Sequence, residues 1–540
     1  MTPLLRPLPR PLTRTLSIVV LAGWGATMAV LVHRSLVEAS SANLATDLAR
    51  YGTAAEWRGV FYRNEKIGFT VSQTVPAGDG FEIQEDGRLQ MSLLGAQTVA
   101  AIRTTARVDR DFVLRSFDFS LDPGTGGTKV HGEVAGRRVH LTISSASGSR
   151  TEDRELDAPP VLALNLPRRL ADAGLKEGAH YEWTIFDPAT LSNTPITLDV
   201  GARELVTADG RRLPAFRVRS SYAGLQTTSW VTDTGEAVRE QSPTGLQTVR
   251  QKPSDAQAMA VSYNVREDLL SASAVVPSGR DRIDEPRNVR RLRLRISGAD
   301  LSNPDIAGVG QTVEGDVLEI RDPQQFKPGP ADPAADDYLK PEPLIESDAP
   351  EIRTEAAAAV ANVAGARARA ERLTRHVNAI LDKKPTVSLP SAREVLRTRV
   401  GDCNEHTALY VAMARAIGIP ARIAVGLVSV GDAFYYHAWP EVYIADGRVG
   451  DMWLPVDPTL NEFPADATHL RFARGGLDKQ AAILPLIGRL KIEILDLETA
   501  ANTTPVVVGR RAEAAPMSIV APSRTVAGCW SPVSERRRRR

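Results

Sequence analysis

Three residues in the last third of the chain have types and spacing that fit thiol chemistry. Cys403 is one of two cysteines, and His437, one of eight histidines, follows it by 34 residues; Asp457 lies 20 residues further on. A cysteine nucleophile needs a base, and the base needs a group that orients it. Spacing alone is weak evidence, because His437 could be a core histidine bonded to a carbonyl, and Asp457, which precedes Pro458, could open a turn.

The sequence around Cys403 predicts that this residue begins a helix. The SARE run at 391–394 has capping-box spacing, so a short helix should start there, and Gly401 can end it as a left-handed residue. Asp402 and Glu405 repeat the capping spacing, which places Cys403 in the first turn of a second helix. Free N–H groups and the helix dipole favour a thiolate there, and the amide of this cysteine can donate to an oxyanion. The alternative is a structural buried thiol, although such a thiol normally lies mid-helix on the apolar face.

The segments that follow should bring the histidine to the aspartate. The GIP run at 418–420 predicts the end of the helix, and 421–430 (ARIAVGLVSV) predicts a buried strand. His437 lies in an alternating run, and ADGRVG at 445–450 is typical of a turn. We therefore expect a hairpin that places His437 beside Asp457.

A metal site is a second interpretation of the same residues. Cys403 and His406 are three residues apart on one helix face, and His437 and Asp457 could complete four ligands. Structural zinc sites usually supply at least two cysteines, which argues against this interpretation. We therefore predict no metal and no cofactor, and we expect His406 to face solvent or to pack on Glu405.

Three sequence blocks resemble the transglutaminase-like superfamily of papain-related cysteine enzymes. They are GDCNEHTALYVAMARAIGIPARIAVGL, HAWPEVYI and WLPVDPT, and the resemblance covers about residues 353–473. It implies that Cys403 is the nucleophile, His437 the general base and Asp457 the orienting acid. It also implies a core in which the nucleophile helix packs against an antiparallel sheet that carries the other two residues.

The chain departs from the family pattern at two points. Calcium-dependent animal transglutaminases place a tryptophan upstream of the cysteine to help hold the oxyanion, but no tryptophan lies between Trp230 and Trp439 here. This argues against calcium-dependent crosslinking. Pro440 replaces the more usual Val or Ile after the HAW motif. Because proline has no N–H group, we expect an edge strand or a bulge at this position.

The composition of the whole chain excludes some classes of function. The 540 residues are 43% hydrophobic, carry a formal net charge of +1 and include only two cysteines. A neutral chain argues against a dedicated nucleic-acid binder, and two cysteines cannot make a disulfide scaffold. The basic run RRLRLRI at 290–296 alternates strictly, so we interpret it as a strand with a basic solvent face.

The N-terminal segment has the pattern of a membrane anchor. Residues 15–32 carry no charged side chain and follow Arg6, Arg10 and Arg14. A run of this length is within the roughly 17–25 residues that cross a bilayer, and the arginines orient the N-terminus toward the cytoplasm. A cleaved signal peptide is the alternative. We therefore predict a single-pass, membrane-anchored protein of the bacterial envelope, with the bulk of the chain extracytoplasmic or periplasmic.

The predicted fold class is α+β, with an N-terminal transmembrane helix, an antiparallel β-rich region and a transglutaminase-like core. Apolar residues from Val360 to Ile380 are expected on one helical face. The expected organisation along the chain is a cytoplasmic N-terminus at 1–14, an anchor at 15–32, a β-rich domain at 51–252, a further β region at 253–320, a linker at 321–352, a catalytic domain at 353–498 and a disordered, arginine-ended tail at 499–540.

The predicted function is thiol-dependent acyl transfer or hydrolysis of amide bonds through Cys403, His437 and Asp457. The expected partners are a peptide or protein amide substrate and the membrane, through the N-terminal helix, with no nucleic acid. The alternative is a non-enzymatic envelope scaffold or binding protein that uses the same core and binds a partner through its β-rich region. The reactivity of Cys403 separates the two, because an activated thiolate alkylates quickly below about pH 7 and a structural thiol does not.

Overall fold

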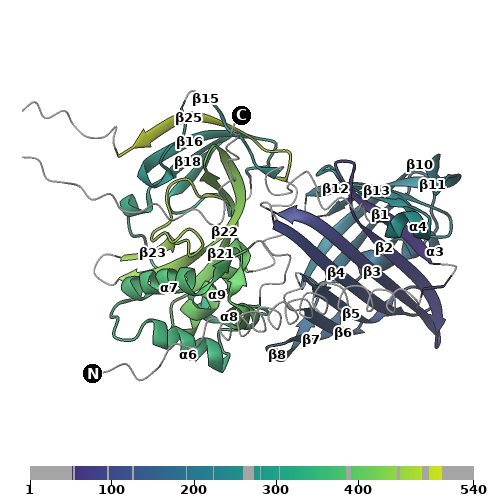
Figure 1. Ribbon diagram of the computed structural model, residues 1–540, viewed down its shortest axis with the longest axis horizontal. Coiled ribbons are helices and arrows are strands. Elements are labelled where there is room, and N and C mark those ends of the chain that lie inside the picture. The colour runs from purple at the N-terminus through teal and green to yellow at the C-terminus, as the bar shows by residue number, and fades with distance from the viewer. Residues whose placement is uncertain are drawn as a thin grey trace, which may run out of the picture. The chain divides into compact units, whose positions relative to one another are not determined.

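The structure is a computed structural model that describes residues 51–500, apart from 53–54, 94–95, 124–126, 190, 223, 259–272, 280, 303–304, 385–390, 447–449 and 477–485. Nearly all of its strands and helices belong to the compact unit Trp57–Arg540 (Figure 1). The predicted anchor at 15–32, and the tail beyond residue 500, lie outside the described residues.

A fourteen-stranded antiparallel sheet occupies the first half of the described chain. Its order is β8-β7-β6-β5-β4-β3-β2-β1-β14-β13-β12-β11-β10-β9, so two meanders join where β1 pairs with β14. Short helices follow β8 (η2 Ala163–Asn165 and α3 Leu166–Asp172) and β14 (α4 Pro253–Gln257). The strands are β1 Glu56–Tyr62, β2 Glu65–Ala77, β3 Gly80–Leu93, β4 Ala96–Val108, β5 Leu114–Asp122, β6 Thr128–Ala135, β7 Arg138–Ser145, β8 Gly148–Glu155, β9 His180–Asp187, β10 Ser192–Ala208, β11 Arg211–Tyr222, β12 Leu225–Val231, β13 Ala237–Gln241 and β14 Leu246–Arg250.

Alternation of apolar and polar residues explains why these segments form strands. In β7, Val139, Leu141 and Ile143 are buried, and the intervening residues are more exposed. The turn before β7 contains Gly136 with φ 65°, a conformation that favours glycine in a two-residue hairpin. β6 and β7 therefore form a hairpin, with Ala135 opposite Arg138.

A five-stranded sheet with the order β15-β25-β16-β18-β17 follows. It combines segments from the middle of the chain with a strand close to residue 500. Its strands and the neighbouring 3-10 helices are β15 Ser278–Gly279, β16 Val289–Ser297, β17 Gln311–Glu314, β18 Val317–Arg321, β25 Lys491–Thr499, η3 Pro286–Asn288, η4 Pro323–Gln325 and η5 Ala335–Leu339.

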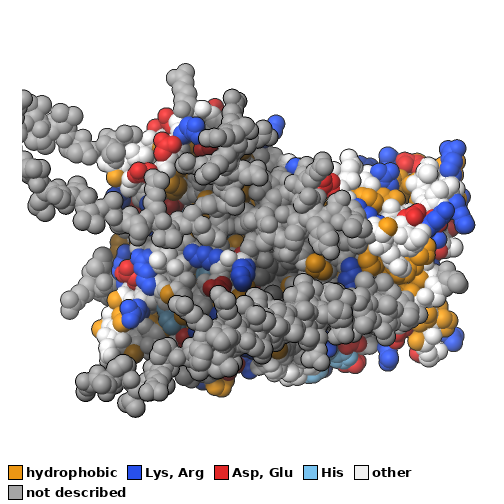
Figure 2. Space-filling view, in the orientation of Figure 1, with side chains coloured by type: hydrophobic (Ala, Val, Ile, Leu, Met, Phe, Trp, Pro, Cys, Tyr) orange, Lys and Arg blue, Asp and Glu red, His pale blue; other side chains and the backbone are white. Residues whose placement is uncertain are grey.

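The basic run lies in β16, as the alternation predicts, with its apolar side chains buried. Its arginines face acidic residues of the adjacent strand β25. Arg291 donates to Asp496 at 2.6 Å, and Arg295 donates to Glu493 at 2.7 Å. In Figure 2, basic and acidic side chains are likewise interspersed over the coloured part of the surface. Arg291 and Arg295 are therefore paired with acidic residues within the sheet, which agrees with the prediction of a solvated strand face.

Four helices and a second antiparallel sheet, with the order β23-β22-β21-β24, form the core that contains the candidate site. Helix α9 lies against β21 and β22 (Figure 1), and all its residues except Asn404 and Ala416 are buried. These elements are α6 Pro350–Ala359, α7 Ala366–Ile380, α8 Ala392–Thr398, α9 Cys403–Ala416, β21 Ala421–Val430, β22 Ala433–Asp446, β23 Gly450–Pro455 and β24 Leu470–Gly475, with a short parallel pair of β19 Asp382–Lys383 and β20 Val400–Gly401.

The single helical face predicted from Val360 to Ile380 is wrong at its beginning. Helix α6 ends before Val360, and α7 begins after Gly365, whose φ of 85° is incompatible with a continuous helix. Within α7 the predicted face is buried, including Leu373 and Val377.

The predicted fold class also needs correction. Of the described residues, 51% lie in strands and 19% in helices, because the fourteen-stranded and five-stranded sheets outweigh the helices of the core. Among the described residues, no helix is long and apolar enough to span a membrane. The longest of those in the core, α7, has 15 residues and falls short of the about 20 that a span requires.

Candidate active site

Cys403 is the first residue of α9, as the capping pattern predicts. The Asp402 carboxylate accepts a hydrogen bond from the Asn404 amide at 2.9 Å, and the Glu405 carboxylate accepts one from the Asp402 amide at 2.8 Å. This capping box fixes the start of the helix, and the Cys403 side chain there is 8% exposed. The positive end of the helix dipole favours an ionised sulfur at such a position.

Gly401 does not end α8 as a left-handed residue, contrary to the prediction. The left-handed residue that ends α8 is Arg399, with φ 55°. Its amide makes the last hydrogen bond of the helix, to the Val395 carbonyl. Gly401 instead belongs to β20, and a Cβ there would lie 2.2 Å from the Cβ of Glu405. A glycine is therefore needed here so that the capping carboxylate of Glu405 can fold over the backbone.

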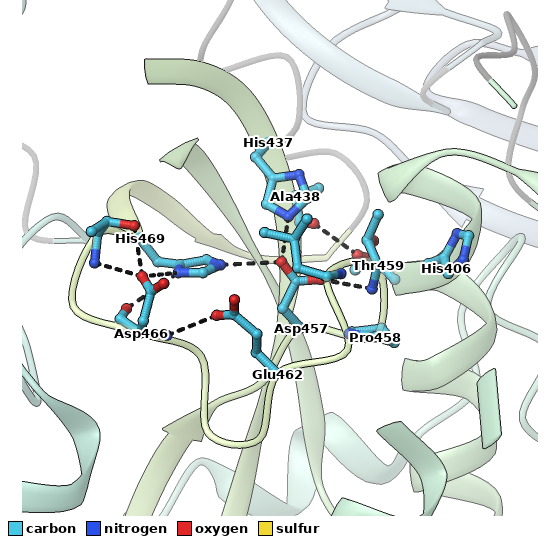
Figure 3. A network of polar contacts seen from close by, with 12 residues as sticks. His406, His437, Ala438, Asp457, Pro458, Thr459, Glu462, Asp466 and His469 are labelled. Carbon is cyan, nitrogen blue, oxygen red and sulfur yellow. Dashed lines mark hydrogen bonds and ion pairs between the residues drawn. The ribbon is translucent and has the colours of Figure 1, made fainter. Parts of the chain in front are cut away.

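His437 of β22 and Asp457, which lies just beyond β23, are joined by a buried hydrogen bond (Figure 3). The distance from His437 Nε2 to Asp457 Oδ2 is 2.7 Å, and both side chains are fully buried. Thr407 of α9 donates to the Ala438 carbonyl at 3.1 Å, which packs the first part of the helix beside this stretch of β22. The predicted hairpin is present, and the assignment of catalytic roles to these residues stays a prediction.

The remaining contacts of Asp457 hold it as a carboxylate. Its second oxygen accepts from the amides of Thr459 at 2.7 Å and Leu460 at 2.9 Å. Burial would raise the pKa of Asp457, but the histidines and their hydrogen bonds outweigh burial and hold that pKa well below its ordinary value. A fixed anion in this place sets the tautomer and the ring orientation of His437.

A second histidine, His469, binds the same carboxylate oxygen and was not predicted. Its Nε2 lies 3.1 Å from Asp457 Oδ2, and its Nδ1 lies 3.2 Å from Asp466 Oδ1. Burial lowers the pKa of His469, but the two carboxylates raise it well above the ordinary value. Both ring nitrogens then donate, so His469 is an imidazolium between two anions. The only sequence signal was its place three residues after Asp466, which is too common to indicate this contact.

Asp466, which binds His469, is connected in turn to Glu462. The Asp466 amide donates to Glu462 at 3.2 Å, and Arg287 donates to the other oxygen of Glu462 at 3.0 Å. Burial and the nearby charge of Asp466 raise the pKa of Glu462, whereas hydrogen bonds from His469 and Thr468 outweigh burial and lower that of Asp466. The network therefore carries its negative charge on the two aspartates that bind His469.

Trp439 covers this pair of histidines. Its ring stacks on His437 with 6.1 Å between the centroids and meets His469 edge-on at 5.1 Å. The tryptophan is 1% exposed, so it shields the hydrogen bond between His437 and Asp457 from water. Alternation along β22 places the histidine and the tryptophan on the same face of the strand.

A buried ionic group next to the site joins β22 to β21 and to β24. Glu441 accepts from Arg422 of β21 at 2.8 Å and from Arg471 of β24 at 2.5 Å. Burial opposes ionisation, but the two guanidinium groups outweigh it and lower the pKa of Glu441 to about 2. Arg422 also lies 3.8 Å from the centroid of the Trp453 ring. These contacts connect all four strands of the sheet that carries His437.

The prediction of an edge strand or a bulge at Pro440 is wrong. β22 is an interior strand, and Pro440 pairs with Ile423 without a shift in register. Its carbonyl accepts from the Val456 amide, just beyond the last residue of the ladder with β23. The proline is tolerated because its missing N–H group falls where that ladder has ended.

His406 is buried, contrary to the expectation that it faces solvent or packs on Glu405. Its Nδ1 lies 2.7 Å from the Asp402 carbonyl, and burial lowers its pKa. The four-ligand set built on Cys403 and His406 is not assembled among the described residues. The ligand-type atoms that approach one another closely there belong to His437, Asp457 and His469, and to Glu462, Asp466 and His469.

The comparison with family models identifies the class of this core. Residues 352–458 match the model of the transglutaminase-like superfamily. The chain therefore contains a transglutaminase-like domain over these residues. The matched segment includes Cys403, His437 and Asp457 and ends before His469.

Solved structures with similarity to the chain include two proteins of related description. A putative cysteine protease from Cytophaga hutchinsonii is 17% identical, with 38% of this chain and 81% of that chain covered and a TM-score of 0.26. A putative protease from Parabacteroides distasonis is 13% identical, with 71% and 69% covered and a TM-score of 0.19. No curated protein matches the chain.

Proposed function

We propose that the protein catalyses thiol-dependent acyl transfer from a peptide or protein amide, with Cys403 as the nucleophile. One observation carries the proposal. The only cysteine of the transglutaminase-like domain begins a capped helix that packs beside the strand of His437, whose ring is fixed by Asp457. A thiol, a base and an orienting anion are the parts that this chemistry requires.

The first half of the reaction forms a thioester. The Cys403 sulfur attacks the amide carbonyl carbon, and the Cys403 amide at the start of α9 donates to the resulting oxyanion. The carbon–nitrogen bond then breaks as His437 gives its proton to the leaving amine. Nε2 of His437 is held by Asp457, so Nδ1 is the nitrogen that exchanges this proton.

The second half releases the acyl group. His437 takes a proton from water or from an amine, which attacks the thioester carbon, and the carbon–sulfur bond breaks to regenerate the thiolate. Water gives hydrolysis and an amine gives a transferase. Both outcomes use the same side chains, so the proposal covers the acyl-enzyme step that they share.

His469 is a positioning residue in this proposal. It shares Asp457 Oδ2 with His437 and so acts on the proposed base through that carboxylate. Its positive charge keeps Asp457 ionised and moderates the negative charge that His437 experiences. The prediction is that His469 sets the pH range of activity through Asp457.

The experiment that tests the proposal traps the acyl-enzyme. The purified full-length chain is incubated with a mixture of peptide amides, with and without an added primary amine, and Cys403 is analysed by mass spectrometry. We expect acyl adducts on Cys403, product release in the native chain, and neither in Cys403→Ala. Cys529→Ala is the matched control and should behave like the native chain. Equal turnover by Cys403→Ala would contradict the proposal and favour the non-enzymatic scaffold.

A further inference from the structure

The fourteen-stranded sheet contains a cavity that the proposed chemistry does not use. Its volume is about 410 Å³, within the range of about 300–1,000 Å³ that is typical of small-molecule sites. All of its lining residues belong to the sheet, to η2 and α3, or to the turns beside them. The cavity is thus a feature of this region alone.

One side of the cavity is apolar. Leu170 of α3, Ile185 of β9 and a pair of side chains from β10 line it, and all belong to one buried cluster. The β10 pair consists of Ile196 and Leu198. Such a wall fits the hydrocarbon part of a ligand.

The other side carries polar groups from β11, β12 and β13. Glu240 pairs in register with Ser229, and Tyr222 of β11 pairs with Ile196 of the apolar wall. Burial, followed by the charges of Asp187 and Glu240, raises the pKa of Tyr222, so its hydroxyl stays a hydrogen-bond donor in the cavity lining. The cavity therefore has a polar side and an apolar side that meet between β11 and β10.

Glu240 is the group that points to a ligand. No hydrogen bond or ion pair reaches its carboxylate from the described residues, and its side chain lines the cavity, where it is exposed. Desolvation raises the pKa of Glu240, followed by the opposing effect of Arg58 and the reinforcing charge of Glu85. The arginine does not neutralise Glu240, because it donates to Ser72 at 2.9 Å and lies 3.5 Å from Glu85.

We propose that this cavity binds an amphiphilic cation, with a primary ammonium group against Glu240 and an alkyl chain along the wall of Ile196 and Leu198. An ammonium group donates to the carboxylate and can also donate to Ser229 and Tyr222. A carboxylate ligand would place a second negative charge beside Glu240, and a neutral alkyl ligand would form no charge-assisted hydrogen bond with it.

Titration calorimetry of the full-length chain with three ligands tests this inference. The ligands are n-octylammonium, octan-1-ol and octanoate, which share a chain and differ in charge. We expect the ammonium ion to bind with one-to-one stoichiometry and about tenfold more tightly than the alcohol, because a charge-assisted hydrogen bond is made only by the cation. Octanoate should bind most weakly.

Three variants complete the test. Glu240→Gln should remove the tenfold difference in affinity between the ammonium ion and the alcohol, and it should leave the affinity for the alcohol unchanged. Glu182→Gln, at an exposed position of β9 outside the cavity lining, is the matched control and should change neither affinity. Ser229→Leu, which narrows the cavity, should weaken both ligands. Absence of ammonium binding to the native chain, octanoate binding as tight as ammonium binding, or an unchanged ammonium affinity in Glu240→Gln would each overturn the inference.

Discussion

Two carboxylates, one buried in the core and one exposed in the cavity of the large sheet, have opposite surroundings. Asp457 is bound by two histidines and two backbone amides, and these partners lower its pKa. Glu240 has no such partners among the described residues, and its pKa is raised. Desolvation acts in the same direction on both, so partners decide the charge state. The comparison separates an anion that is already organised for chemistry from an anion that is suited to receive a cation.

The substitution with the largest expected effect tests Asp457, the carboxylate whose partners are already in place. Asp457→Asn keeps the shape of the side chain but removes the charge that fixes the His437 tautomer. We expect kcat/KM for a reactive peptide amide to fall by about 10⁴-fold, as when the triad acid is replaced in other enzymes. Glu240→Gln is the matched amide substitution in the sheet and should leave kcat/KM unchanged. A loss of less than tenfold in Asp457→Asn would remove Asp457 from the mechanism.

Glu441→Gln tests whether organised buried charge also holds the sheet together. Removing this carboxylate leaves two buried arginines without their partner, so the free energy of unfolding should fall by about 3 kcal/mol in denaturant titrations. Because the pKa of Glu441 is about 2 in the folded protein and 4.5 is the reference value, its contribution is present above about pH 4.5 and is lost as the pH falls toward 2. The exposed pair of Glu493 with Arg295 is the control, and Glu493→Gln should lower stability by no more than about 0.5 kcal/mol. Equal effects of the two substitutions would contradict this account.

His469→Gln sharpens the role of the second histidine. The imidazolium faces Asp457 and Asp466, with His437 and Glu462 nearby. Its loss leaves Asp457 more negative toward His437, so the alkaline limb of the pH profile of kcat/KM should move up by about one pH unit. His376→Gln, a half-buried histidine of α7 paired with Glu355, should leave the profile in place. A fall in kcat without movement of the limb would show a purely structural role for His469.

The smallest expected effect is a change in stability caused by a substitution at Glu240 in the fourteen-stranded sheet. The pKa of Glu240 is raised, so the native chain is favoured below the reference pKa of 4.5 and loses stability as the pH rises through the folded value. Glu240→Gln avoids that loss and should be more stable near pH 8 by about 0.5 kcal/mol, a small value because water in the cavity screens the charge. The gain should vanish near pH 4 in parallel denaturant titrations. A variant less stable than the native chain at pH 8 would mean that Glu240 has a favourable partner.

Local patterns predicted the parts of the site that depend on neighbours in sequence. The capping spacing located the start of α9 at Cys403, and the turn before β23 predicted that His437 approaches Asp457. His469 could not be found this way, because its contact with Asp457 depends on the path of the chain between β23 and β24. Likewise, nothing near His406 in the sequence showed that both faces of α9 would be covered.

The fold was predictable strand by strand but not as a whole. Alternation identified β16 as a strand, and it carries the expected buried face. The number of strands in one sheet depends on long-range pairing, such as that of β1 with β14, which alternation does not encode. The sequence therefore predicted an α+β fold, whereas most of the described residues lie in strands.

The most direct test of the central claim compares the alkylation rates of the two cysteines at about pH 6. Iodoacetamide is added to the folded full-length chain, and the adducts on Cys403 and Cys529 are followed separately by mass spectrometry. A thiolate stabilised by the start of α9 and by His437 should react at least about tenfold faster than Cys529 at this pH, and Asp457→Asn should reduce the advantage. If Cys403 reacts no faster than Cys529, and reacts appreciably only as the pH approaches about 8.5, it is a structural thiol and the proposed chemistry is wrong.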